Sequence, residues 1–281
     1  MMKNTDLAIF FGARINWMFN HGADDKWNPD CKYIQVDSCE EEFDSNVHID
    51  NPILGDCSLT ASLLLDELKE KALKIDTALW LSDIDEVKNI NTHKLLQKVD
   101  YDKTPMSFVS AFFTIKKVME NHENLSIVNE GANTLDIGRM ILPICNPRSR
   151  LDSGTWGTMG IGMPYAIAAA ICNGNPVLAV EGDSAFGFSG MEIETICRYN
   201  LPVIVIIMNN GGIYKGDNES FYKDDPSPGS FIPNESYEKM IEAFGGDKYL
   251  IKNTKELEET LEVAISNRRP AILNCLIKTV E

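Results

Sequence analysis

The sequence predicts an α/β fold built on a doubly wound parallel sheet. Short apolar runs of strand length alternate with segments of helical periodicity along most of the chain. This alternation is typical of parallel sheets whose strands are joined by helices. In addition, the apolar runs 177–180 and 203–208 each end in a polar, glycine-rich turn. We therefore expect both turns to lie at one edge of the sheet, where parallel strands present ligand sites.

Residues 1–72 are predicted to form a small α/β unit of their own. The expected elements are strands at 7–11 and 33–36, a loop at 51–56 and a helix at 59–71. Asp37 directly follows the second strand, where nucleotide-binding folds place an acid that contacts ribose. A solvated loop acid is the alternative for this position. We interpret the unit as a partial Rossmann-like domain.

Residues 73–103 are rich in charged side chains and lack strand signals, so we expect a linker with some helix. Residues 104–281 are predicted to form the main sheet domain. Pro105 is expected in the first turn of its first helix, 106–120, where proline is tolerated. The other expected helices are 160–172, 191–200, 237–244 and 255–266, and the expected strands are 125–128, 177–180, 203–208, 248–251 and 271–277. The loop 214–236 is a candidate segment for covering a substrate.

Composition excludes several classes of partner. The chain has 26 basic and 42 acidic residues, a formal net charge of −16, which argues against binding nucleic acid or an anionic membrane. Its seven cysteines are scattered and form no Cys-x-x-Cys motif, which is typical of a reducing compartment. No apolar run is long enough to span a bilayer, and the first residues lack a signal-peptide pattern. We expect a soluble, cytoplasmic protein.

Two polar side chains follow the paired strands and suggest a metal site. Asp183 and Asn210 each come directly after an apolar run, beside several glycines. Carboxylate, side-chain amide and main-chain carbonyl oxygens are ligands that suit Mg²⁺. Glycines allow backbone N–H groups to approach phosphate closely. Either turn alone is more often an ordinary loop, but together they predict a Mg²⁺-diphosphate site.

The order of these motifs resembles the thiamine diphosphate fingerprint, in which Gly-Asp-X is followed at a fixed distance by Asn-Asn. Three separated stretches are more specifically similar to oxalyl-CoA decarboxylases and the related 2-hydroxyacyl-CoA lyases. They are residues 181–202, which begin Glu-Gly-Asp-Ser-Ala-Phe-Gly-Phe, the Asn-Glu-Gly-Ala-Asn run at 129–133, and residues 150–162. The resemblance covers nearly the whole chain, but only about the C-terminal half of the family's length.

The resemblance implies specific ligands. Mg²⁺ would be held by side-chain oxygens of Asp183 and Asn210 and by the Gly212 carbonyl. Thiamine diphosphate would contact four segments: Gly131, Ala132 and Asn133; Gly157, Thr158 and Met159; Gly182, Asp183, Ser184 and Ala185; and Asn210, Gly212, Ile213 and Tyr214. Met159 resembles the apolar wedge that keeps the cofactor bent, with core filling as the alternative.

Other residues are given weaker roles. Glu130 is either an acid/base group or an acceptor that fixes a loop, and Trp156 and Tyr199 are expected to be packing residues. The family's middle domain, which binds a nucleotide such as ADP, corresponds to residues 1–72. By that correspondence Gly12, Arg14 and Asp37 are candidate nucleotide contacts.

The implied reaction is cleavage of a carbon–carbon bond in an acyl-CoA, with the thiazolium of the cofactor accepting the released electron pair. The leading expectation is oxalyl-CoA decarboxylation to formyl-CoA and CO₂. A 2-hydroxyacyl-CoA lyase or acetolactate-synthase-like activity is the first alternative. A non-catalytic cofactor-binding partner subunit and a gene remnant are the others.

Nothing in the sequence resembles the family's pyrimidine-binding domain, whose glutamate activates the cofactor. We therefore assign no catalytic residue and expect little turnover from this chain by itself. The family builds its site between subunits, so we expect a homo-oligomer or pairing with a chain that carries the pyrimidine domain.

Overall fold

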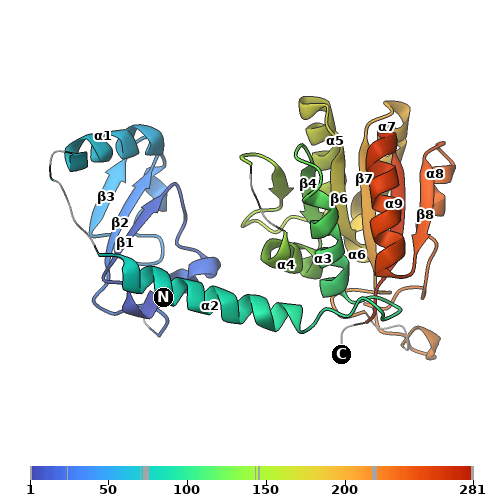
Figure 1. Ribbon diagram of the computed structural model, residues 1–281, viewed down its shortest axis with the longest axis horizontal. Helices are drawn as coiled ribbons and strands as arrows, with labels where there is room; N and C mark the ends of the chain where they lie inside the picture. Colours follow the sequence, from blue (N-terminus) through green and yellow to red (C-terminus); the bar gives the residue numbers. More distant parts are fainter. Residues whose placement is uncertain are drawn as a thin grey trace. The chain divides into compact units, whose positions relative to one another are not determined.

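The computed structural model describes residues 2–23, 25–69, 71, 76–142, 144, 146–216 and 220–279. The chain divides into two compact units, Met1–Thr92 and His93–Glu281 (Figure 1).

The first unit contains a three-stranded parallel sheet in the order β1-β2-β3. Its elements are β1 (Leu7–Phe11), β2 (Lys32–Asp37), β3 (Asn51–Leu54) and α1 (Cys57–Lys69). Strand β3 corrects the sequence prediction, which placed a loop at 51–56. β3 is an edge strand of this sheet, where the missing N–H of Pro52 costs no ladder hydrogen bond.

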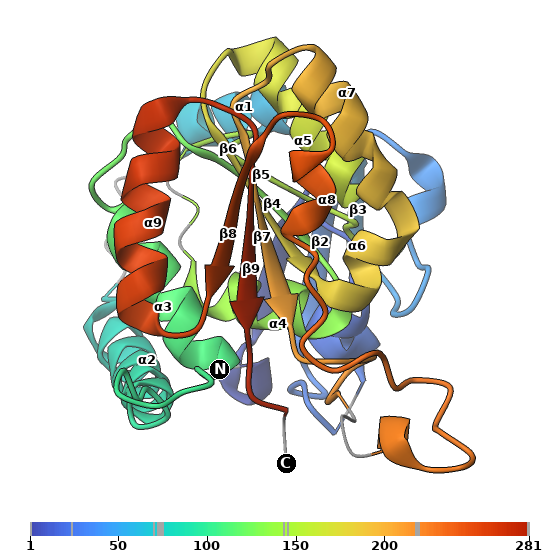
Figure 2. The same cartoon turned by 90° about the vertical axis from the view of Figure 1, so that its right-hand side faces the viewer.

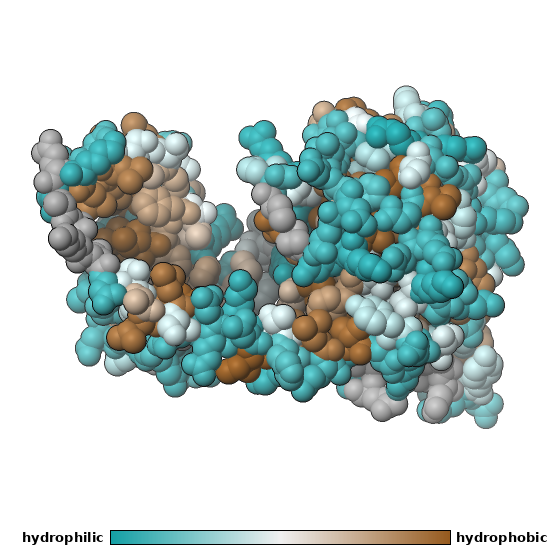
Figure 3. Space-filling model, viewed as in Figure 1, coloured by the Kyte–Doolittle hydropathy of each residue, from teal (hydrophilic) through white to brown (hydrophobic). Residues whose placement is uncertain are grey.

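An aromatic cluster forms the small core of this unit. Phe10 contacts the rings of Trp27 and Tyr33, and the indole N–H of Trp27 donates to the Phe19 carbonyl at 2.8 Å. Many apolar side chains nevertheless stay exposed, among them Leu63 of α1, and Figure 3 shows apolar surface gathered on this unit.

The segment predicted as a linker with some helix contains α2 (Ala78–Leu96), a 19-residue helix without a buried side chain. None of the helices in the described part of the chain combines the length and apolar character needed to cross a bilayer.

The second unit is built on a six-stranded sheet in the order β5-β4-β6-β7-β9-β8, with every pair parallel. The strands are β4 (Ser126–Glu130), β5 (Arg150–Asp152), β6 (Val177–Gly182), β7 (Val203–Asn209), β8 (Asp247–Ile251) and β9 (Ala271–Leu276). From β4 the chain goes first to β5 on one side and then to β6 on the other. The direction of winding therefore reverses between β4 and β6.

Helices cover both faces of this sheet (Figure 2). One face packs on α3 (Phe108–Met119), α4 (Ala132–Ile141) and α9 (Thr254–Asn267), and the other on α5 (Gly162–Asn173), α6 (Asp183–Ser189), α7 (Ile193–Arg198) and α8 (Lys239–Glu242). Along β7 the side chains alternate between the two cores, with Ile204 and Ile206 in one and Val205 and Ile207 in the other. The doubly wound parallel sheet predicted from the sequence is confirmed.

Several local predictions were wrong. Helix α3 begins at Phe108, because Ser107 caps it by accepting the Ser110 N–H at 3.1 Å, so Pro105 precedes the helix. The helix predicted at 191–200 is present as a 3₁₀ helix (Gly190–Glu192) continued by α7, so only its bounds and its division differ. Residues 237–244 contain only the four-residue α8. Helix α4, helix α6 and strand β5 were not predicted.

Candidate functional site

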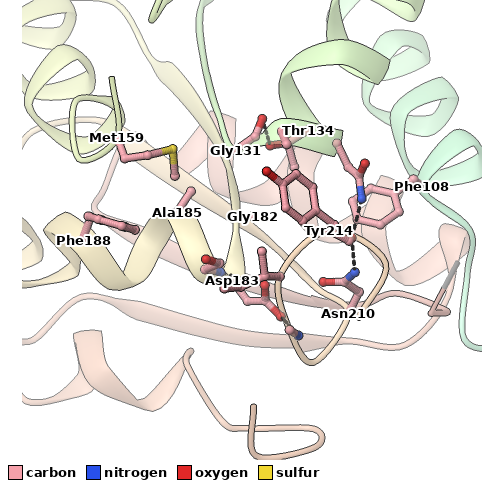
Figure 4. A pocket seen from close by; sticks show the side chains of 15 residues that line it. Phe108, Gly131, Thr134, Met159, Gly182, Asp183, Ala185, Phe188, Asn210 and Tyr214 are labelled. Carbon is pink, nitrogen blue, oxygen red and sulfur yellow. Dashed lines mark hydrogen bonds between the residues drawn. The ribbon is translucent and has the colours of Figure 1, made fainter. Parts of the chain in front are cut away.

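A cavity of about 260 Å³ opens at the carboxyl ends of β4, β6 and β7. This is the place where the winding of the sheet reverses, the position at which doubly wound proteins bind ligands. Of the predicted cofactor contacts, all but Gly157 and Thr158 line it. Figure 4 shows Asp183 and Asn210 at one end of the cavity and Met159 and Phe188 at the other.

Asp183 is the first residue of α6 and is 2% exposed. Its Oδ2 accepts the backbone N–H groups of Gly211 and Gly212 at 2.8 and 3.1 Å, and its Oδ1 accepts that of Ser184 at 2.7 Å. Burial raises the pKa of this carboxyl to about 6, against the opposing effect of the amide donors. The carboxylate therefore joins the end of β6 to the turn after β7.

The turn after β7 folds back on Asn210, which is 3% exposed. The Asn210 side-chain amide donates to the Tyr214 carbonyl at 2.9 Å, and the Asn133 amide donates to the same carbonyl. Tyr214 has a φ of +56°, and Gly216 has a φ of +75°. A Cβ at Gly216 would lie 2.2 Å from the Asn210 carbonyl oxygen, so only glycine allows this close approach.

The turn after β4 is also tightly packed. Gly131 precedes α4 with a φ of +102°, and a Cβ there would lie 2.6 Å from the Thr134 hydroxyl oxygen. That hydroxyl donates to the Glu130 carbonyl. Gly131 and the first residues of α4, Ala132, Asn133 and Thr134, line the cavity.

Two buried carboxyl groups lie behind the cavity. Glu130 of β4 and Glu181 of β6 are register partners in the sheet. Glu130 accepts the N–H groups of Gly160 and Gly162, the second at 2.6 Å. Glu130 therefore fixes a loop, one of the two roles that the sequence left open. Burial, followed by repulsion from Glu130, raises the pKa of Glu181 well above its ordinary range.

Sequence reasoning missed Phe108, Thr134 and Phe188 as lining residues. Phe186 and Phe188 are two positions apart in α6 and so cannot both face the core, but this signal depends on the helix, which was not predicted. Phe186 is buried and Phe188 is exposed. Phe108 comes from a helix distant in sequence, and no local signal marks it.

The candidate nucleotide residues of the first unit have other contacts. Arg14 forms an ion pair with Glu42 at 2.7 Å, and Asp37 accepts the Cys39 N–H at 3.0 Å. Gly12 has a φ of +57° and donates to the Val36 carbonyl at 2.8 Å. These contacts account for the loop geometry, so a nucleotide at this position stays a prediction from the sequence alone.

The oxygens around the cavity suit a hard divalent cation. Among the described residues, no group of three His, Cys, Asp or Glu side chains could hold a metal ion. Any metal in the cavity would rely on one carboxylate, with amide, main-chain, phosphate and water oxygens as further ligands. Asp183, Asn210 and Gly212 all line the cavity, and their role as metal ligands stays a prediction from the sequence.

The fold and cavity together define a cofactor-binding α/β protein of the doubly wound class, with its site at the switch point of the sheet. Residues 131–275 match the C-terminal TPP binding domain of thiamine pyrophosphate enzymes, and residues 1–64 match the central domain of these enzymes. The chain belongs to the thiamine pyrophosphate enzyme family.

Individual relatives lie in two groups. The chain is 43% identical over 277 residues to oxalyl-CoA decarboxylase of Escherichia coli K12, covering 98% of this chain and 49% of that protein. It is 41% identical over 283 residues to 2-hydroxyacyl-CoA lyase of Oryza sativa, covering 97% and 49%. Human 2-hydroxyacyl-CoA lyase 1 is 37% identical over 293 residues, with 99% and 50% covered. The chain spans about half the length of these relatives.

Proposed function

We propose that this chain supplies the diphosphate half of a thiamine diphosphate-dependent carbon–carbon lyase that acts on an acyl-CoA. The observation that carries this proposal is the Asp183 carboxylate at the end of β6, which accepts the N–H groups of Gly211 and Gly212 after β7. This contact places a buried anion and a folded glycine turn at the same edge of the cavity.

Within this proposal the chain's residues have separate tasks. Asp183, Asn210 and the Gly212 carbonyl hold Mg²⁺, which binds the diphosphate. Gly182, Ser184 and Ala185, at the start of α6, face the diphosphate, since backbone N–H groups at a helix start attract anions.

The remaining predicted contacts surround the rest of the cofactor. Gly131, Ala132 and Asn133 lie on the β4 side, Ile213 and Tyr214 lie on the β7 side, and Met159 supports the bend. When bound, the cofactor supplies a nucleophilic carbon and an electron sink. The chain orients it and limits access of water.

Oxalyl-CoA is the substrate that we propose first, and a 2-hydroxyacyl-CoA is the alternative. The two groups of relatives are 43% and 41% identical to the chain, so similarity favours the first only slightly. Product analysis with a pyrimidine-domain chain present separates them, because one yields CO₂ and formyl-CoA and the other an aldehyde and formyl-CoA. We further propose a domain division at 1–72, 73–103 and 104–281, a homo-oligomer or a pairing with that second chain, and a cytoplasmic location.

Calorimetric titration of thiamine diphosphate, with and without Mg²⁺, tests the cofactor site. We expect Mg²⁺-dependent binding that Asp183→Asn abolishes, because the amide removes a charge and an oxygen ligand. Asp247→Asn is the matched control, since Asp247 begins β8 at the opposite end of the sheet. Binding that is unaffected by Mg²⁺ or by Asp183→Asn would contradict the proposal.

A further inference from the structure

The carboxylate of Glu130 holds the segment that carries Met159. Glu130 is the last residue of β4 and is 2% exposed. Its two oxygens accept different N–H groups, one from Gly160 and one from Gly162 at 2.6 Å. Gly160 directly follows Met159, and Gly162 lies two residues further on, so a single side chain connects the sheet to the loop that supplies one wall of the cavity.

The side chains of Glu181 and Glu130 also restrict this segment sterically, because they pack closely against Gly162. A Cβ on Gly162 would lie 2.0 Å from Oε1 of Glu181 and 2.7 Å from Oε2 of Glu130. Both carboxyl groups therefore converge on the Gly162 main chain. Gly160 has a φ of +84°, so its backbone adopts a conformation that glycine takes readily.

The two glutamates differ in what they do for this segment. Within the described residues neither oxygen of Glu181 has a hydrogen-bond partner, whereas each oxygen of Glu130 accepts an N–H. Glu181 thus contributes bulk behind Gly162. Glu130 contributes directional bonds, and an anion at the first turn of α5 also interacts favourably with the helix dipole.

We propose that Glu130 is a positioning residue, which sets the place of Met159 in the cavity through the backbone N–H groups of Gly160 and Gly162. The role of Met159 toward the cofactor rests on the proposed function. The attachment of the 159–162 segment to Glu130 does not, and can be measured without any cofactor.

The test compares two isosteric variants of the whole chain, Glu130→Gln and Glu181→Gln. In Glu130→Gln one oxygen becomes an NH₂ group that faces a backbone N–H, so one bond is lost and two donors oppose each other. In Glu181→Gln no hydrogen bond to the main chain changes. The readouts are hydrogen exchange of peptides covering 157–163 and the NMR signal of methyl-labelled methionine, with the Met159 signal assigned by Met159→Leu.

We expect Glu130→Gln to speed exchange in this segment by about tenfold and to shift or broaden the Met159 methyl signal. The buried Met208 of β7 should be unaffected and serves as the internal reference. Glu181→Gln should change neither readout substantially. Equal effects of both variants would overturn the proposal. So would loss of protection throughout the sheet in Glu130→Gln, because that result assigns Glu130 to general stability.

A second measurement separates this proposal from the proposed function. Thiamine diphosphate with Mg²⁺ is titrated into the wild type and both variants. Weaker binding in Glu130→Gln alone supports positioning of Met159 toward the cofactor. If the wild type binds no cofactor even with a pyrimidine-domain chain present, the proposed function fails, while the exchange and methyl readouts still decide the role of Glu130. If the wild type binds and Glu130→Gln binds equally well, the link from Glu130 to cofactor positioning is wrong.

Discussion

The Asp183 carboxylate accepts the backbone N–H of Gly211 at 2.8 Å, and so connects the turns that follow two neighbouring strands. Asp183 begins α6 and Gly211 follows the end of β7. The same carboxyl group is buried and has a pKa raised to about 6. A group that organises the turn therefore also carries an energetic cost when it is ionised without a cation nearby.

Because of this cost, the free energy of unfolding of the cofactor-free protein should depend on pH. Because the folded-state pKa of Asp183 lies above the unfolded value, the folded protein keeps a proton that the unfolded chain releases between about pH 4 and pH 6. The contribution of Asp183 to the free energy of unfolding is fully present below this window and is lost as the pH rises through it. Urea unfolding at several pH values should show the wild type losing about 3 kcal/mol relative to Asp183→Asn across the window. Parallel pH profiles for the two proteins would contradict the assignment.

Gly216→Ala should affect cofactor affinity more strongly than it affects the stability of the fold. Gly216→Ala and Gly174→Ala both place alanine at a positive φ, and this backbone strain alone should lower the free energy of unfolding by about 1 kcal/mol in each. Only at Gly216 does the new Cβ meet backbone, the Asn210 carbonyl oxygen, whereas the space around Gly174 is open. Calorimetry should show thiamine diphosphate affinity at least about tenfold weaker in Gly216→Ala, since misplacing a ligand by an ångström is costly. Equal affinity in the two variants would show that the Asn210 turn tolerates displacement.

Asn133 should hold the Tyr214 turn through its side-chain donor. Its amide and that of Asn210 donate to the same Tyr214 carbonyl. Asn133→Ala removes one donor, while Asn133→Asp places a carboxylate oxygen against that carbonyl. We expect the aspartate variant to weaken cofactor affinity more than the alanine variant, as measured by titration with Mg²⁺ present. The reverse order would mean that the donor does not act on this turn.

Helix α9 provides a stability control remote from the cavity. Asn253 caps it by accepting the Glu256 N–H at 2.9 Å, while Glu256 accepts the Lys252 N–H at 2.8 Å. Asn253→Ala should lower the free energy of unfolding by about 1 kcal/mol in urea titrations. Thiamine diphosphate affinity should not change, because no α9 residue among those described lines the cavity. A change in affinity would reveal coupling between α9 and the site.

The sequence predicted the sheet well because its strands are continuous apolar runs, and runs of this kind are visible without any tertiary information. It also indicated that Asp183 and Asn210 would lie at one edge, since both follow such runs. The contacts between segments were not predictable. The bonds from Glu130 to Gly160 and Gly162 depend on how a distant loop folds back, and no local pattern encodes them.

The wrong predictions also arose where tertiary structure overrides the local sequence pattern. Residues 51–54 were predicted as a loop but form the edge strand β3, where Pro52 is tolerated. The segment after 177–180 was predicted to be a polar, glycine-rich turn, but Asp183 begins helix α6 directly. Gly157 and Thr158 were included by resemblance, and the structure leaves both outside the cavity lining.

The strand order has a consequence for folding during synthesis. Strand β9 lies between β7 and β8 in the sheet, although β8 comes before it in the chain. During synthesis β8 (Asp247–Ile251) therefore emerges before β9, the strand with which it pairs. Until Ala271–Leu276 has emerged, one edge of β7 stays unpaired and open to association with other chains. The turn that carries Asn210 lies at the end of that strand, so the cavity can take its final form only after nearly all of this unit has been made.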